Sequence, residues 1–329
     1  MLPCAADHES VSHRSRLVCG RNGGPRALGC CQASQRAAPR DGSRPFWTAG
    51  TDCGRHFPAV ARQLTNAFAC LEDVGPNDAV FDELTFIDEW QQPAQIADIR
   101  RHKLEATTQL LGDTISVSDE QWQSPSRLPG WTRAHVAAHL ARNADAFSQA
   151  LEGLVAGGCP TLYGSASERR WVIERDSMRS GLEIQIDLDT SAGRINSRLT
   201  EMFSFAEQNP EAIDQRVMHR ISLIPLARLN ETVLHHVDLD IGFEIEELQQ
   251  PVAGWLLEFN LANPIITGSL PAIELRSTDG FSASLPGDGQ PQQPQTLTAS
   301  TAALLGWLTG RLRPEVSDDL GLPRPPAAR

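Results

Sequence analysis

The stretch Glu231-Thr-Val-Leu-His-His-Val-Asp-Leu239 holds side chains whose types and spacing suit metal binding. Pro225 precedes it and Gly242 follows it, which predicts a helix between them, because proline is tolerated at a helix start and glycine at its end. Positions four apart share one helix face, so Glu231 and His235 point the same way and Asp238 follows one turn later. A carboxylate and an imidazole on one face supply half of a divalent-metal site.

The remaining side chains of this helix indicate that it is buried. Apolar residues cover most of its circumference: Leu226, Leu229, Val233, Leu234, Val237 and Leu239. On an exposed helix, Glu231 and His235 would be an ordinary solvated pair, and this is the alternative interpretation. In a buried helix both groups need partners, and a metal ion is one partner that satisfies both.

The composition limits the classes of function. The chain has 329 residues, enough for two domains, and a net charge of -12, which argues against phosphate-backbone binding to nucleic acids. No apolar run of about 18 residues exists, so no membrane span is predicted. Six of the seven cysteines lie in the first 70 residues without a C-x-x-C pair or a secretory signal. These features favour reduced thiols and a cytoplasmic location.

Changes in composition divide the chain into four segments. Residues 1–95 are predicted to be a disordered or extraneous extension, since nine arginines face four acidic residues in 1–65 and no apolar period persists. Residues 96–245 are expected to form a four-helix bundle, and residues 246–320 a small α+β domain. Residues 321–329 are expected to be a mobile tail. The predicted fold class is therefore α+β.

Within the bundle, helices are expected over about 96–112, 132–157, 168–208 and 225–242. The segment 216–224 is interpreted as a short extended connector. In the second domain, 273–276 and 281–285 are expected to be strands, and a helix capped by Ser300 should end at Gly310. Metal sites in such bundles form from side chains on facing helices.

The second predicted helix carries its own polar face. His135 and His139 are four residues apart and share a face, and Arg142 and Asn143 lie one turn past His139.

Three motifs now resemble one family. Leu128-Pro-Gly-Trp-Thr-Arg-Ala-His-Val-Ala-Ala-His-Leu-Ala-Arg-Asn-Ala-Asp145 and the stretch 231–239 resemble the mycothiol-dependent maleylpyruvate isomerases, which belong to the DinB-like metal-binding four-helix-bundle superfamily. The closing motif, Ala302-Ala-Leu-Leu-Gly-Trp-Leu-Thr-Gly-Arg311, resembles the C-terminal domain of that family. The resemblance covers about residues 96–320.

The resemblance implies a metal ion, expected to be zinc, held by His139, Glu231 and His235. Such a set leaves coordination positions open, as a catalytic zinc requires. His135 is an alternative to His139. His236 points about 100° away from His235, and Asp238 is expected to be a partner of a ligand and not a ligand itself.

The resemblance also implies a reaction, the cis–trans isomerisation of maleylpyruvate to fumarylpyruvate in gentisate breakdown. Addition of the mycothiol thiolate would convert the double bond into a rotatable single bond, and expulsion of the thiol would restore it. The expected partners are thus a small dicarboxylate and a low-molecular-weight thiol.

Four polar residues are candidates for binding these partners. Arg311 matches a family arginine that reaches the active site and is a candidate substrate clamp; its alternative role is a helix C-terminal cap. Arg228 is a second candidate clamp. Arg142 and Asn143 are predicted to line the thiol or substrate pocket, with helix packing as their alternative role.

Two other functions remain open. A zinc-dependent mycothiol S-transferase would use the same site and yield a stable thioether. A ligand-binding module, which the small C-terminal domain also allows, would need no metal and would not turn over maleylpyruvate.

Overall fold

The computed structural model describes residues 93–155, 165–213, 215–263, 267, 270–285 and 294–323. These all belong to one compact unit, residues 49–329. The predictions for residues 1–92 and for 324–329 lie outside the described residues.

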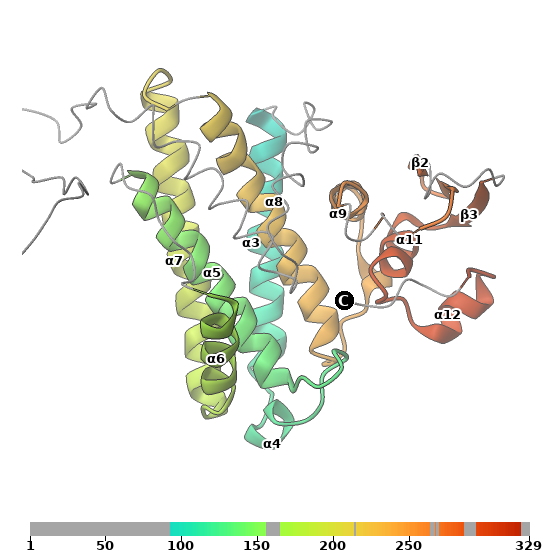
Figure 1. The fold of residues 1–329 in the computed structure, drawn as a ribbon, viewed down its shortest axis with the longest axis horizontal. Coiled ribbons are helices and arrows are strands. Elements are labelled where there is room, and N and C mark those ends of the chain that lie inside the picture. The colour runs from blue at the N-terminus through green and yellow to red at the C-terminus, as the bar shows by residue number, and fades with distance from the viewer. Residues whose placement is uncertain are drawn as a thin grey trace, which may run out of the picture. The chain divides into compact units, whose positions relative to one another are not determined.

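Four long helices form the helical half of the protein: α3 (Pro93–Thr114), α5 (Arg133–Val155), α7 (Gly181–Gln208) and α8 (Gln215–Asp238). They run alongside one another in Figure 1, and α5 packs against both α7 and α8 while α3 packs against α8 and α7. The predicted helical bundle followed by a small mixed part is confirmed as the fold class. The proposed limits of the two domains stay a prediction.

The predicted third helical region is in fact two helices. Helix α6 (Ala166–Ser177) ends before Ser180, which caps α7 in a reciprocal arrangement with Glu183. The serine hydroxyl accepts the Glu183 amide, and the Glu183 carboxylate accepts the Ser180 amide. This local start signal explains why a single helix over 168–208 was the wrong interpretation. A similar box at Ser118 and Gln121 starts the short helix α4 (Asp119–Trp122).

The extended connector expected at 216–224 is also wrong, because α8 begins at Gln215 and contains Pro225 in its interior. An interior proline costs a helix roughly 3 kcal/mol. Ile221, Ile224 and Leu226 are at most 1% exposed on either side of it. Their burial outweighs the lost hydrogen bond, since one large apolar side chain contributes about 1.5–3 kcal/mol.

The C-terminal part begins with the turn η4 (Ile245–Glu247) and α9 (Val252–Leu261). Its sheet has the order β2-β1-β3, with β1 (Ile273–Ser277) antiparallel to β2 (Ser282–Leu285) and parallel to β3 (Gln295–Ala299). Helices α11 (Thr301–Leu308) and α12 (Pro314–Asp319) follow. The two predicted strands and the helix capped by Ser300 are confirmed. The polar strand β3 was missed, although its Leu297 and Ala299 are buried.

One continuous apolar cluster includes both parts of the protein. It contains Phe147 and Leu199 of the bundle together with Leu305 and Trp307 of α11. Helix α8 contributes Leu226, Leu229 and Val233 to this cluster, so the helix that carries the candidate metal ligands is firmly held. Among the described helices, none has the length and apolar character that a membrane crossing requires.

Candidate metal centre

The structure brings three of the predicted ligands together between α5 and α8. His139 comes from α5, and Glu231 and His235 come from α8 (Figure 1 shows the two helices). One potential donor atom from each residue lies within 4.8 Å of the other two. His139 Nε2 lies 3.1 Å from Glu231 Oε2, and His235 Nε2 lies 3.5 Å from the same oxygen.

Hydrogen bonds near the start of α5 hold this helix to the end of α8. The loop before α5 is bound to the end of α8, since the Arg127 amide donates to the Asp238 carbonyl at 2.9 Å. Arg133 Nε, in the first turn of α5, donates to the Leu239 carbonyl at 2.7 Å. These contacts fix the position of His139 along the bundle axis relative to His235.

Burial and mutual hydrogen bonds shift the pKa values of all three side chains. Burial lowers the pKa of His139 to about 4. Burial also opposes the charge of Glu231, but hydrogen bonds from both histidines prevail and lower the pKa of its carboxyl. For His235, burial is likewise outweighed, here by bonds to Asp238 and Glu231, and the pKa rises to about 8. The centre therefore holds a buried carboxylate charge that favours a cation beside it.

Asp238 and Arg311 extend the centre into the C-terminal part. His235 Nδ1 donates to Asp238 Oδ2 at 2.8 Å. Arg311 holds the same carboxylate with two bonds, from Nε to Oδ1 at 3.1 Å and from NH2 to Oδ2 at 2.9 Å. The Asp238 side chain is 1% exposed and that of Arg311 8%. A carboxylate bonded to Nδ1 fixes the imidazole with Nε2 turned toward Glu231.

Arg169 of α6 is a residue at this site that sequence reasoning missed. Its guanidinium NH2 donates to His139 Nδ1 at 3.1 Å. No described carboxylate pairs with Arg169, whereas Arg142 and Arg311 both pair with carboxylates. Nothing in its sequence position marked it, because α6 lies beyond a loop and its approach to α5 depends on tertiary packing.

The other predicted pocket residues are engaged elsewhere. Arg142 forms ion pairs with Asp176 at 2.7 Å and Asp187 at 2.6 Å, which favours the helix-packing role left open for it. Arg228, 5% exposed, donates to Asn143 Oδ1, so these two residues join α8 to α5 inside the bundle. Whether Arg142, Asn143 or Arg228 contacts a thiol or a substrate stays a prediction.

The other two histidines considered from the sequence, His135 and His236, lie outside the cluster of donors. His135, the alternative to His139, contacts Glu174 at 3.0 Å through Nε2 and Thr132 at 2.7 Å through Nδ1. His236 stacks on Phe243, with ring centroids 4.3 Å apart, on another face of α8. Among the described residues, His139, Glu231 and His235 form the one group of three with the spacing of a metal site.

The comparison with known families decides the relationship. The family model described as the mycothiol maleylpyruvate isomerase N-terminal domain matches residues 104–240, which include all three candidate ligands. Residues 104–240 are therefore similar to the mycothiol maleylpyruvate isomerase N-terminal domain family. The resemblance read from the two helical motifs is confirmed.

Solved structures agree with this family at the level of the fold. Two crystal structures of the mycothiol-dependent maleylpyruvate isomerase, one of them of a histidine-to-alanine mutant, match with a TM-score of 0.56 at 19% identity. Each match covers 70% of this chain and 96% of the other. No curated protein sequence matches this chain.

The donor set fits a divalent ion. Two imidazole nitrogens and one carboxylate oxygen are ligands that zinc accepts, and three protein ligands are typical of catalytic zinc. With ligands at about 2.1 Å, tetrahedral donors lie roughly 3.4 Å apart. The two contacts of 3.1 and 3.5 Å to Glu231 are already near that spacing. The three residues thus form a candidate metal site.

Proposed function

We propose that the protein is a metal-dependent, mycothiol-using isomerase that converts maleylpyruvate to fumarylpyruvate. The convergence of His139, Glu231 and His235 on one point, inside a domain of this family, carries the proposal. Zinc is the proposed ion, and when bound it would lower the pKa of a thiol and polarise a carbonyl oxygen. Mycothiol would supply the sulfur whose reversible addition permits rotation about the substrate's carbon–carbon bond.

The residues of the chain have separate roles in this proposal. Glu231 and the two histidines hold the ion. Asp238 keeps a proton on His235 Nδ1, so that the lone pair of Nε2 can coordinate the metal. Arg169, at 3.1 Å from His139, supplies positive charge beside the centre for an anionic substrate or thiol. The two helical motifs, residues 128–145 and 231–239, contain no cysteine, which agrees with a nucleophile brought by a cofactor.

Metal analysis of the purified protein tests the ligand set. We expect about one zinc per chain in the wild type and none in His139→Ala, Glu231→Ala or His235→Ala, because each change removes one of three donors. His135→Ala is the matched control, since it removes the neighbouring histidine on α5 and should keep the metal. Metal retained in all three ligand variants would refute the site.

An assay with maleylpyruvate and mycothiol tests the reaction. Formation of fumarylpyruvate in the wild type and its loss in Glu231→Ala are the expected results. A stable thioether without isomerised product would instead identify a mycothiol S-transferase. A protein that binds zinc but performs neither reaction would retain the metal site and refute the proposed activity.

A further inference from the structure

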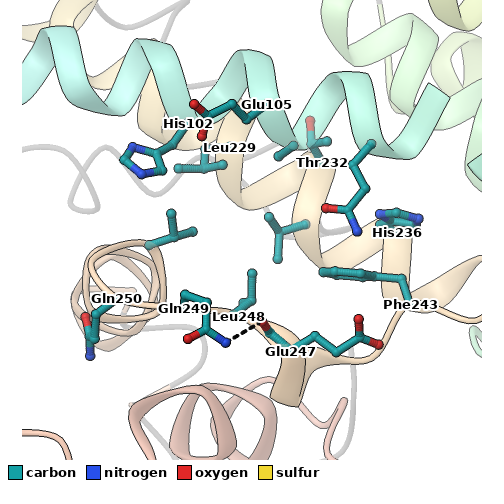
Figure 2. A pocket seen from close by; sticks show the side chains of 14 residues that line it. His102, Glu105, Leu229, Thr232, His236, Phe243, Glu247, Leu248, Gln249 and Gln250 are labelled. Carbon is teal, nitrogen blue, oxygen red and sulfur yellow. Dashed lines mark hydrogen bonds between the residues drawn. The ribbon is translucent and has the colours of Figure 1, made fainter. Parts of the chain in front are cut away.

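A cavity lies on the other side of α8 from the candidate metal centre. It has a volume of about 370 Å³ and lies between α3, α8 and the segment 243–252, as Figure 2 shows. Thr232 and His236 line it, and these residues directly follow Glu231 and His235 in the sequence. Successive helix residues point about 100° apart. None of the three candidate metal ligands lines the cavity, so it is a separate site.

The inside of this cavity is apolar and its edge is polar. Leu229, Val233 and Phe243 line it and are between 0% and 8% exposed. The polar lining residues Glu105, Glu247 and Gln249 are exposed to solvent. The volume of this cavity is near the lower limit for small-molecule sites. Its apolar interior and few polar groups are typical of such sites, so the cavity suits a small molecule.

The edge carries negative charge and spare hydrogen-bond acceptors. The residues that line the cavity include two carboxylates, Glu105 and Glu247, and no lysine or arginine. Arg101, outside the lining, pairs with Glu105 Oε1 at 2.8 Å, and Glu247 Oε1 accepts the Glu244 amide at 3.1 Å. Within the described residues, the Oε2 atom of each carboxylate accepts no bond.

The other polar groups reinforce this preference. Gln249 donates its amide nitrogen to the Glu247 carbonyl at 3.1 Å, so its side-chain oxygen is left to accept. His102 bonds through Nδ1 to the Asp98 carbonyl at 2.9 Å and through Nε2 to Arg101 at 3.3 Å. The lining thus has no lysine or arginine to meet an anionic ligand.

We propose that this cavity binds a small organic ammonium ion. The hydrocarbon part of the ligand packs against Leu229, Val233 and Phe243, and the ammonium group donates to one of the two carboxylates at the edge, Glu105 or Glu247. A dicarboxylate of the kind proposed for the metal centre is excluded here by like charge. The inference does not depend on the proposed isomerase activity.

Calorimetric titration of the full chain with two matched probes tests this site. The probes are 2-phenylethylammonium and 3-phenylpropionate, which share an aromatic body and differ in the sign of the end group. We expect binding of the ammonium probe and no measurable binding of the carboxylate. Absence of ammonium binding, or equal binding of both probes, would overturn the proposal.

Two variants locate the binding. The double variant Glu105→Gln, Glu247→Gln should weaken ammonium binding by about fivefold, since it removes whichever carboxylate pairs with the ammonium group and one exposed charge pair contributes on the order of that factor. Glu201→Gln, an exposed glutamate on α7, is the control and should bind as the wild type does. Both changes are at exposed positions, and thermal unfolding confirms that the variants are folded. Unchanged affinity in the double variant would overturn the assignment.

Discussion

At the residue scale, the contact between Arg169 and His139 has a consequence for ligand binding. A guanidinium can only donate, so His139 Nδ1 accepts and its proton resides on Nε2, which donates to Glu231. A metal ion at Nε2 requires the opposite tautomer, with the proton on Nδ1. Arg169 must then give up this bond, and its charge becomes available to an anion at the centre.

We therefore expect Arg169→Met to raise the KM for maleylpyruvate about tenfold or more while the zinc content stays unchanged. One charge-assisted hydrogen bond contributes about 1.5–3 kcal/mol, which is at least a factor of ten. Arg169→Lys should recover part of the loss, because it restores the charge without the planar fork. Steady-state kinetics and metal analysis measure both effects.

The neighbouring Arg170, which is exposed, provides the control variant Arg170→Met. It should leave the KM unchanged. An unaltered KM in Arg169→Met would show that the anion is bound by another residue, and loss of zinc in that variant would show a structural role.

At the scale of the elements, the end of α8 is joined to the turn after α11 through Asp238 and Arg311. Arg311 bonds to both oxygens of the Asp238 carboxylate. The Asp238 carboxylate in turn orients the imidazole of His235. The arrangement favours a positioning role for Arg311 over direct contact with the substrate. The C-terminal part then contributes to the metal centre without supplying a ligand.

Arg311→Met should lower the affinity for zinc by up to about tenfold, because it removes the anchor of Asp238, whereas loss of the histidine's direct partner typically costs about 10- to 100-fold. Arg311→Lys should lie between this variant and the wild type. Competition with a chromogenic chelator measures the affinity directly. Arg313→Met is the control, because Arg313 is half-exposed and contacts Glu246 and Glu244, away from Asp238. Unchanged zinc affinity with a raised KM would instead support the substrate clamp.

Local signals explain which elements were predictable from the sequence. Helix α5 was expected because Thr132 can cap it, and the Thr132 hydroxyl does accept the His135 amide at 3.4 Å. Helix α8 was predicted too short, because Pro225 is a strong local stop and only the buried core around it permits continuation. Strand β3 had no alternating apolar pattern long enough to detect.

The candidate site divides in the same way. His139, Glu231 and His235 follow from helical spacing and from the motifs, which are local properties. The partners of the arginines do not, since a long side chain can reach any of several neighbours. Arg142 pairs with Asp176 and Asp187, and Arg311 pairs with Asp238. Arg169 contacts His139 from α6, a helix that carries no recognisable motif.

At the scale of the whole molecule, Lys103 links global stability to pH. It is the only lysine of the chain, it is 4% exposed in α3, and its ammonium donates to Asn196 of α7. Burial, assisted by the charges of Arg228 and Arg100, lowers its pKa to about 7. The unfolded chain restores the ordinary value of 10.5, so between these limits the unfolded state binds more protons.

The free energy of unfolding should therefore rise as pH increases from about 7 toward 10.5, and below pH 7 the full cost of a buried ammonium is present. Lys103→Met removes this contribution, so the variant should gain a few kcal/mol relative to the wild type near pH 6.5, at about 1.4 kcal/mol per unit of pKa shift. That advantage should shrink steadily up to pH 9.5. Urea unfolding of both proteins at several pH values measures the difference, in which groups common to both cancel. Loss of the bond to Asn196 adds a constant offset to the difference in unfolding free energy between the two proteins, so the change of that difference with pH is the decisive quantity. A difference that does not change with pH would show that Lys103 does not have a lowered pKa in the folded protein.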